Sequence, residues 1–308
     1  MKKTAYFKGK VGGWFMNLGE YPLSLLLHRK PKDNITVQND LKYGEGKRET
    51  INMIFDHTVT DKQPAFIYIH GGGWCSGLPK MRNTYCMEYA ERGWVSANIG
   101  YEYAPKMTFP NQFKQIYKAI DWLYDHSEEY HIDMTKVTLA GESAGGYFIT
   151  YMAAMSLDHT LYDKLGIDFK HRDEFNVSAL VSNCGAVDFG RLIDNKFLGI
   201  KYMINAFTGF SHKEIRANLD KDEIKILSPE VKEGFPPTML IYAKNDFLKT
   251  ESFALQKRFD EIGTPYRMHC AEGILSMHAF PLATIEKRGK ACLDDTVDFI
   301  SQYAKQDV

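Results

Sequence analysis

A serine flanked by glycines is the part of this sequence whose residue types and spacing most directly indicate chemistry. Ser143 stands in the Gly-x-Ser-x-Gly pattern of residues 141–145, between a strand-like run at 136–140 and a helix-like run at 144–155. A serine on so tight a strand-to-helix turn adopts a strained backbone, and the residues two positions away must be small. The start of the following helix favours the negative charge that develops during acyl transfer. An ordinary helix cap is the alternative interpretation, but the strand before and the helix after favour a nucleophile.

Three consecutive glycines follow an earlier strand-like run, in the segment His-Gly-Gly-Gly-Trp of residues 70–74. Glycine loses more backbone entropy on folding than other residues, so a run of three requires a structural reason. A flexible turn and a phosphate-binding loop are the alternatives. A phosphate loop would continue with Lys-Ser or Lys-Thr into a helix, whereas Trp74-Cys75 follows here. We expect instead an oxyanion hole, in which the backbone N–H groups of Gly72, Gly73 and Ala144 bind the charged oxygen of the reacting substrate.

A serine nucleophile needs a general base, and His278 has the appropriate place among the ten histidines. It follows the last predicted strand and precedes the closing helix, which agrees with the chain order serine, acid, histidine. The acid that orients the imidazole is expected after the strand at 238–243, which favours Asp246. Asp188, after the strand at 179–182, is the alternative, and an aspartate in a loop is often only a turn former.

Strand-like and helix-like segments alternate along most of the chain, and this alternation predicts the fold class. The expected strands are short apolar or alternating runs, at 35–43, 50–55, 65–69, 94–99, 136–140, 179–182, 238–243 and 266–270. Helical spacing is expected at 80–92, 111–125, 144–155, 252–262 and 290–304. Such alternation is typical of βαβ units. We therefore expect an α/β protein whose mostly parallel central sheet is flanked by helices.

Two segments depart from the alternation and are expected to form a small helical cap over one edge of the sheet. Residues 1–34 look helical and amphipathic, and residues 190–233 contain two or three helical stretches rich in aromatic residues. With this cap, residues 1–308 form a single domain. Cap aromatics could line an acyl pocket, although aromatics of amphipathic helices are more often core. Trp74, Glu142, Phe207 and Phe210 are the residues that we expect to contact the substrate.

The composition narrows the choice of partners. The 308 residues include 38 Lys and Arg against 39 Asp and Glu, a net charge of −1, so no strongly basic face for nucleic acid is expected. Five cysteines without a CxxC pair indicate neither a disulfide framework nor a structural metal site, and favour a cytoplasmic setting. No apolar run is long enough to span a bilayer, and the N-terminal residues lack a secretion-signal core. A small, neutral or weakly charged substrate fits best, and the oligomeric state cannot be predicted.

Several of these motifs together resemble those of the hormone-sensitive-lipase-like esterases, a branch of the α/β-hydrolase fold. The shared pieces are His70–Trp74, Gly141–Gly146, Asp246–Leu248 and His278–Phe280, with Tyr101–Pro105, Phe109-Pro110 and Leu227–Pro229 as further similarities. The resemblance covers roughly residues 60–300. The sequence differs at Glu102, where that branch usually has Arg, at Lys106, where it usually has Glu, and at Ala279, where Gly is commoner. These differences bear on substrate preference and not on the catalytic candidates.

The resemblance implies a serine carboxylesterase that acts through an acyl-enzyme on Ser143, without a cofactor. Its substrates would be short-chain acyl esters, or small aromatic or acetylated-sugar esters. An amidase or peptidase would use the same three residues, and a non-catalytic binding module could keep the same fold. Most peptidases of this fold carry an additional large domain, for which 308 residues leave no room. Binding modules usually lose a catalytic residue, whereas all three candidates are present here.

Overall fold

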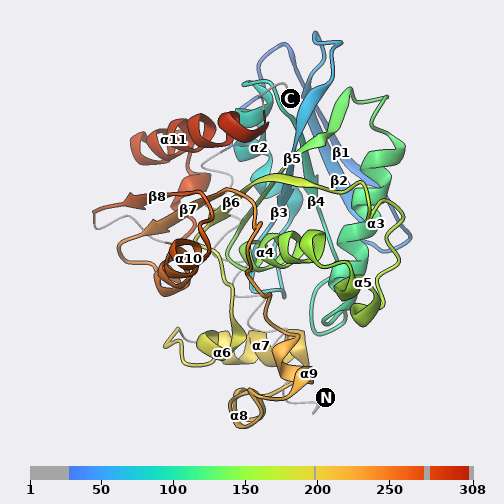
Figure 1. The fold of residues 1–308 in the computed structure, drawn as a ribbon. Coiled ribbons are helices and arrows are strands. Elements are labelled where there is room, and N and C mark those ends of the chain that lie inside the picture. The colour runs from blue at the N-terminus through green and yellow to red at the C-terminus, as the bar shows by residue number, and fades with distance from the viewer. Residues whose placement is uncertain (1–27, 198, 274–277, 305–308) are drawn as a thin grey trace.

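Eight strands form one sheet in the order β1-β2-β4-β3-β5-β6-β7-β8, in a computed structural model that describes residues 28–197, 199–273 and 278–304 (Figure 1). The strands are β1 (Ile35–Lys42), β2 (Thr50–Asp56), β3 (Gln63–Ile69), β4 (Val95–Ile99), β5 (Ile132–Glu142), β6 (Val177–Asn183), β7 (Thr238–Ala243) and β8 (Tyr266–Ala271). β1 and β2 pair antiparallel, as do β2 and β4, and every other pairing is parallel. Each predicted strand is present, and the predicted α/β fold class is confirmed.

The register of the central strands aligns the chain segments that carry the predicted chemistry. Ile69 at the end of β3 pairs with Gly141 near the end of β5, and Glu142 pairs with Asn183 at the end of β6. Because parallel strands end at the same edge of a sheet, the loops that follow β3, β5 and β6 leave side by side. The glycine-rich loop and Ser143 are therefore neighbours in space although about 70 residues separate them.

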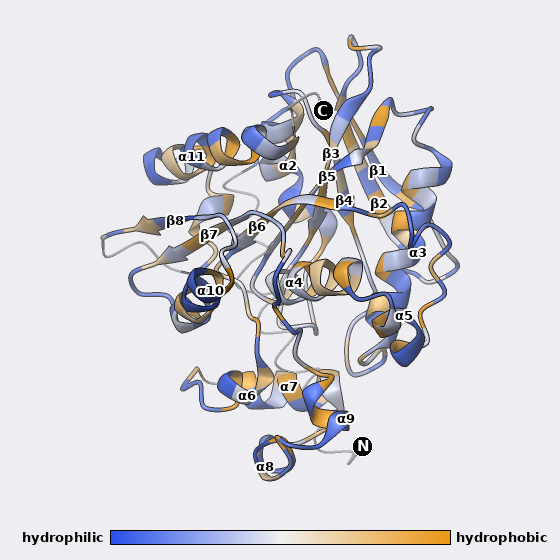
Figure 2. Cartoon of the chain, viewed as in Figure 1, coloured by the Kyte–Doolittle hydropathy of each residue, from blue (hydrophilic) through white to orange (hydrophobic). Residues whose placement is uncertain are grey.

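Helices cover both faces of the sheet. One face packs against α2 (Asn83–Ala90) and α11 (Lys287–Ala304), and the other against α3 (Asn111–Asp125), α4 (Ala144–Leu157) and α10 (Lys249–Ile262). α4 lies in the middle of its layer, where every residue from 144 to 155 is buried. Figure 2 accordingly shows α4 pale to orange along its length, whereas α10 presents a hydrophilic outer side. The helix that carries Ser143 at its start is thus held on all sides by apolar packing.

Three short helical segments lie outside the predicted pattern or refine it. The predicted helix at 80–92 divides into a 3₁₀ turn, η1 (Pro79–Arg82), followed by α2. A short helix that the sequence did not indicate, α5 (Thr160–Leu165), follows α4, and a second 3₁₀ turn, η2 (Phe280–Leu282), comes soon after His278. None of these segments changes the order of the sheet.

The predicted insertion between β6 and β7 lies beyond the edge of the sheet, and its described residues form four short helices where two or three were expected (Figure 1). They are α6 (Phe189–Leu192), α7 (Ile200–Thr208), α8 (His212–Ala217) and α9 (Asp222–Lys225). α7 buries Ile200, Met203, Ile204 and Phe207, which recur at helical spacing and give it one apolar face. This face is directed toward the loops that follow the central strands, because Ile200 and Met203 line a cavity with Ser143.

The N-terminal part of the predicted cap was expected to be helical as far as residue 34. Residues 28–34 form no helix, and Pro31 supplies the reason, because the residue before a proline is disfavoured in the helical conformation. The prediction of a helix as far as residue 34 is therefore wrong at its end. The rest of that predicted segment lies outside the described residues.

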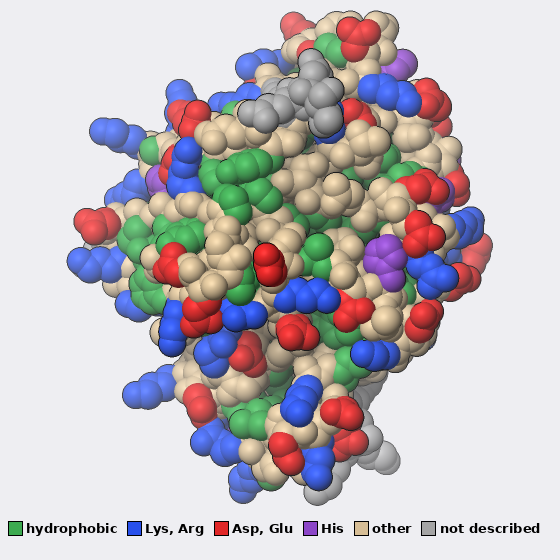
Figure 3. All heavy atoms as spheres, in the orientation of Figure 1, with side chains coloured by type: hydrophobic (Ala, Val, Ile, Leu, Met, Phe, Trp, Pro, Cys, Tyr) green, Lys and Arg blue, Asp and Glu red, His purple; other side chains and the backbone are tan. Residues whose placement is uncertain are grey.

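The surface agrees with the near-zero net charge. On the face seen in Figure 3, acidic and basic side chains are interspersed, and neither sign dominates. Of the helices that the structure describes, none combines the length and the apolar character required to cross a bilayer.

Candidate active site

Ser143 occupies a strained turn between β5 and α4. Its backbone has φ 54° and ψ −116°, a conformation that a side-chain-bearing residue adopts only at a cost of about 1–3 kcal/mol. Two hydrogen bonds hold it there: its N–H donates to Asn183 O at 3.0 Å, and its carbonyl accepts from Ala186 N at 2.9 Å. The surrounding strands thus impose the conformation that the Gly-x-Ser-x-Gly pattern predicted.

Gly145 shows why the positions beside this serine must lack a side chain. A Cβ atom on Gly145 would lie 2.0 Å from the carbonyl oxygen of Ile69, closer than any real contact. The first turn of α4 therefore packs directly on the end of β3. This close approach brings the helix N-terminus, and the Ser143 that precedes it, against the glycine-rich loop.

The glycine-rich loop lies beside Ser143, because Gly73 and Ser143 line the same cavity. Gly72 and Gly73 have φ 107° and 58°, the left-handed region that glycine enters without strain. The loop is held from within, because Gly72 O accepts from the N–H groups of Cys75 and Ser76, each at 3.1 Å. Within the described residues, the N–H groups of Gly72, Gly73 and Ala144 have no hydrogen-bond acceptor. These are the three donors predicted for an oxyanion hole.

Glu142, immediately before Ser143, faces away from the cavity and into a buried polar cluster. Its carboxylate accepts from Tyr68 Oη at 2.6 Å and from Arg82 at 2.8 Å (Nε) and 2.6 Å (Nη2). Both charged side chains are almost fully buried, with 2% and 4% of their area exposed. A buried pair of this kind is satisfied only while both partners are present. Glu142 therefore supports the turn from below, and no contact with a substrate follows from its position.

His278 is paired with Asp246. Its Nδ1 lies 3.1 Å from Asp246 Oδ1, an oxygen that also accepts from Leu248 N at 2.7 Å. Burial alone raises the pKa of the Asp246 carboxyl, but the hydrogen bonds and charge of His278, with smaller contributions from the Cys184 thiol and Leu248 N–H, outweigh burial, so its pKa lies below the ordinary value. Histidine, aspartate and cysteine are types that bind metals, but here they engage one another, and we assign no metal to them.

Asp188, the other candidate acid, has a different set of partners. Its Oδ1 accepts from Gly190 N at 2.7 Å and caps α6, and its Oδ2 accepts from Arg191 Nη1 at 2.9 Å. Arg191 also pairs with the buried Glu251 of α10, at 3.0 Å between Nε and Oε1. This aspartate joins the insertion to the sheet and to α10. The structure thus brings His278 together with Asp246, not with Asp188.

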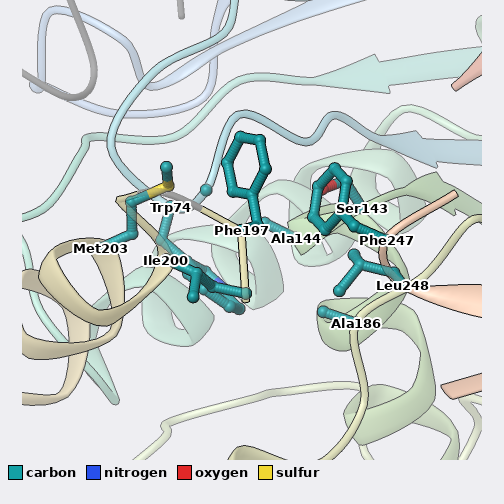
Figure 4. A pocket seen from close by; sticks show the side chains of 10 residues that line it. Trp74, Ser143, Ala144, Ala186, Phe197, Ile200, Met203, Phe247 and Leu248 are labelled. Atoms are coloured by element: carbon teal, nitrogen blue, oxygen red, sulfur yellow. The ribbon is translucent and has the colours of Figure 1, made fainter. Parts of the chain in front are cut away.

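A small cavity opens beside Ser143 (Figure 4). Its lining is almost wholly apolar and comprises Gly73, Trp74, Ser143, Ala144, Ala186, Phe197, Ile200, Met203, Phe247 and Leu248. Its volume is about 30 Å³. A single water molecule requires roughly 10–15 Å³ by the same measure, so there is room for a group of only a few atoms.

The four residues expected to contact substrate take different positions. Trp74 lines the cavity, and Phe207 stacks behind it with ring centroids 5.0 Å apart. Phe210 is half-buried against the core and does not belong to the lining, and Glu142 has the partners described above. Phe197 is the aromatic of the insertion that does reach the cavity.

The sequence interpretation did not single out several lining residues, among them Met203 and Phe247. Met203 lies over the glycine-rich loop, since a Cβ on Gly73 would meet its Sδ at 2.1 Å. Phe247 stacks on Phe197, with centroids 4.2 Å apart, and its ring lies 4.5 Å from that of His278. The signals were the helical spacing of Met203 with Phe207 and the position of Phe247 directly after Asp246.

Comparisons with known proteins agree with this architecture. The alpha/beta hydrolase fold family Abhydrolase_3 matches residues 66–282. An esterase from Gibberella moniliformis is 27% identical over 286 residues, which cover 91% of this chain and 86% of that protein. An esterase from Fusarium pseudograminearum is 30% identical over 253 residues, or 80% of this chain and 74% of that protein.

Among solved structures, esterase B from Lactobacillus rhamnosis superposes with a TM-score of 0.83 at 20% identity, over 99% of this chain and 96% of that one. The resemblance to hormone-sensitive-lipase-like esterases is confirmed. The chain therefore belongs to the alpha/beta hydrolase fold family Abhydrolase_3 and is a carboxylesterase of that family.

Proposed function

We propose that the chain hydrolyses short-chain acyl esters through an acyl-enzyme on Ser143, with His278 as general base and Asp246 as the acid that orients it. The observation that carries this proposal is the shared cavity. Ser143, Gly73 and Ala144 line one space of about 30 Å³, which supports a nucleophile and two of the expected N–H donors beside a volume that fits a small acyl group.

The proposed reaction has two halves. Ser143 Oγ gives its proton to His278 and attacks the ester carbonyl, while the N–H groups of Gly72, Gly73 and Ala144 hold the oxyanion. His278 then protonates the leaving alcohol, and the acyl group stays on Ser143. A water molecule, deprotonated by His278, attacks the acyl-enzyme, and the proton returns to Ser143 Oγ as the acid leaves. Asp246 holds the imidazole through Nδ1 and stabilises its charged form, without taking the proton itself.

Ser143→Ala tests the nucleophile on p-nitrophenyl acetate. The variant should lose on the order of 10⁶-fold in kcat, as expected when a nucleophile of this kind is removed. Ser156→Ala is a matched control, because Ser156 lies at the other end of α4 and donates only to Ala153 O. Near-normal turnover by Ser143→Ala, or absence of labelling of Ser143 by a fluorophosphonate, would reject the proposal in favour of another nucleophile or of a binding module.

The acyl preference is tested with p-nitrophenyl esters from acetate to octanoate. The small cavity supports the highest kcat/KM for acetate and butyrate, with a steep fall for longer chains. The butyrate is a useful reference because esterase B has been solved with a C4-C4 SN3 tributyrin phosphonate. A matched acetanilide measures amide hydrolysis in the same assay. Faster cleavage of the anilide than of the ester would favour an amidase instead.

A further inference from the structure

A cysteine thiol lies beside the pair formed by Asp246 and His278. Cys184 follows β6 directly, is fully buried, and has φ 50°, a left-handed conformation. Its N–H donates to Ile241 O of β7 at 2.8 Å, which fixes its backbone on the side of the sheet from which Asp246 leaves. The Cys184 sulfur, one carboxylate oxygen of Asp246 and one ring nitrogen of His278 all lie within 4.8 Å of one another.

The Asp246 carboxylate has one oxygen well supplied with donors and one without. Oδ1 accepts from His278 Nδ1 and from Leu248 N. Oδ2 is buried and has no hydrogen-bond partner among the described residues. An ionised oxygen that is buried without a donor is costly, so the group that faces it matters. The Cys184 sulfur lies within 4.8 Å of a carboxylate oxygen of Asp246.

The protonation states of the two side chains are complementary. Burial, and then the charge of the adjacent Asp246 carboxylate, raise the pKa of the Cys184 thiol well above its ordinary value. Cys184 therefore keeps its proton at neutral pH and has an S–H to donate. The Asp246 pKa lies below its ordinary value despite burial, and the Cys184 thiol is among the groups that lower it. A protonated thiol thus faces an ionised carboxylate.

We propose that Cys184 is a positioning residue, whose S–H donates to the Asp246 carboxylate and keeps it aimed at Nδ1 of His278. This inference rests on the proposed function, because it assigns the thiol to the same acid and base. The thiol forms no bond with the substrate and transfers no proton in the reaction. Its contribution is to supply an S–H donor to the buried carboxylate, so that the carboxylate is less basic than it would be without the thiol.

The inference has a consequence for the pH dependence of the reaction. The titratable groups that bear on Cys184 are Asp246 after β7, His278 after β8 and Cys292 on α11. Burial raises the pKa of Cys292 to about 12, so this thiol does not titrate in the working range. Without the donor, the carboxylate is more basic and holds the imidazolium form of His278 more tightly. The acidic limb of kcat/KM, which reports the base of the free enzyme, then moves to higher pH.

Cys184→Ala and Cys184→Ser form a matched pair, since alanine and serine are nearly equal in size and only serine donates. Both suit the left-handed backbone better than a β-branched residue would. The Ala variant should lose about three- to tenfold in kcat with KM little changed, because it removes one weak donor to a charged group. Its acidic limb should move to higher pH, and the Ser variant should restore both quantities to within about twofold.

Equal kcat values and equal acidic limbs for the Ala and Ser variants would overturn the inference and leave Cys184 as packing only. If the Ala variant does not fold, the Ser variant decides alone. A hydroxyl is the stronger donor, so its acidic limb should lie at or below the wild-type pH, and a limb shifted upward contradicts the inference. Loss of activity in Ser143→Ala, measured alongside, shows that the proposed function holds even where the inference about Cys184 fails.

Discussion

The loops that follow β3, β5, β6 and β7 form one side of the cavity, and we call them the edge. The helical insertion forms the other side, and the two contribute different groups to the cavity. The edge contributes the strained turn at Ser143 with Gly73 and Ala144, and side chains that include Phe247. The insertion contributes apolar side chains, among them Met203. Backbone N–H groups are retained when most residues are substituted, whereas a substitution always changes the side chain at its position. We therefore expect the edge to set the type of reaction and the insertion to influence which acyl group fits.

The two candidate aspartates give the sharpest test of this division, because Asp246 belongs to the edge and Asp188 joins the insertion to it. Asp246→Asn should lower kcat on p-nitrophenyl acetate on the order of 10⁴-fold, since an amide leaves the imidazole in the wrong tautomer. Steady-state kinetics at neutral pH measure this loss.

Asp188→Asn is the matched control for Asp246→Asn. Asparagine also caps helices, so α6 should persist, and only the charge opposite Arg191 is lost. Its kcat should stay within a few-fold of wild type. Comparable losses in the two variants would show that the edge and the junction are not separate in function.

The buried pair of Glu142 and Arg82 supports the edge without reaching the cavity. Arg82→Met leaves Glu142 charged and unpaired inside the protein, and should lower the free energy of unfolding by about 3–5 kcal/mol in urea titrations. Lys62→Met is the control, because Lys62 pairs with Glu128 at an exposed position, where a pair contributes about 0–1 kcal/mol. Equal effects of the two substitutions would mean that the edge does not depend on this buried pair.

Met203→Ala tests the contribution of the insertion. Removing the side chain that lies over Gly73 should enlarge the cavity and raise the ratio of kcat/KM for hexanoate over acetate by about tenfold, the usual effect of one or two methylene groups in an apolar pocket. Tyr202→Ala, at the neighbouring and exposed position of α7, should leave the ratio unchanged. An unchanged ratio in Met203→Ala would assign acyl selection to the edge.

The smallest expected effect concerns acid stability. The pKa of Asp246 in the folded protein is below its ordinary value of 3.8, so the unfolded state binds its proton first as the pH falls. The stability that Asp246 contributes is therefore complete above the unfolded pKa and is lost as the pH falls through the folded pKa. Thermal unfolding from pH 7 to pH 3 should show a steeper decline of Tm below about pH 4 in wild type than in Asp246→Asn. Parallel curves would contradict this assignment.

What could be predicted from the sequence follows the same division between backbone and side chains. The eight strands, the turn at Ser143 and the glycine-rich loop have local signatures, because strand patterns and glycine positions depend on neighbours in the chain. The insertion was predicted to be helical for the same reason. The helix expected as far as residue 34 failed at Pro31, whose effect on the preceding residue outweighed the apolar pattern.

Contacts between distant side chains lay beyond prediction. Arg82 and Glu142 are separated by 60 residues, and only the folded sheet and η1 bring them together. Phe210 was expected at the cavity and packs elsewhere, while Met203 was not expected and lies over Gly73. Both are apolar residues of one insertion, and which of them faces the cavity is decided by how the short helices pack.

The contact between Arg191 and Glu251 limits how this protein could exchange parts with its relatives by recombination. Two crossovers, one after β6 and one between the insertion and α10, would transfer the whole insertion, including Arg191. They would leave Glu251 behind on α10. A chimera that received this insertion would hold Arg191 without Glu251, and a chimera that lost it would hold a buried Glu251 without Arg191. Chimeras should therefore tolerate crossovers placed after α10 better than crossovers placed before it, even though the shorter fragment contains every helix of the insertion.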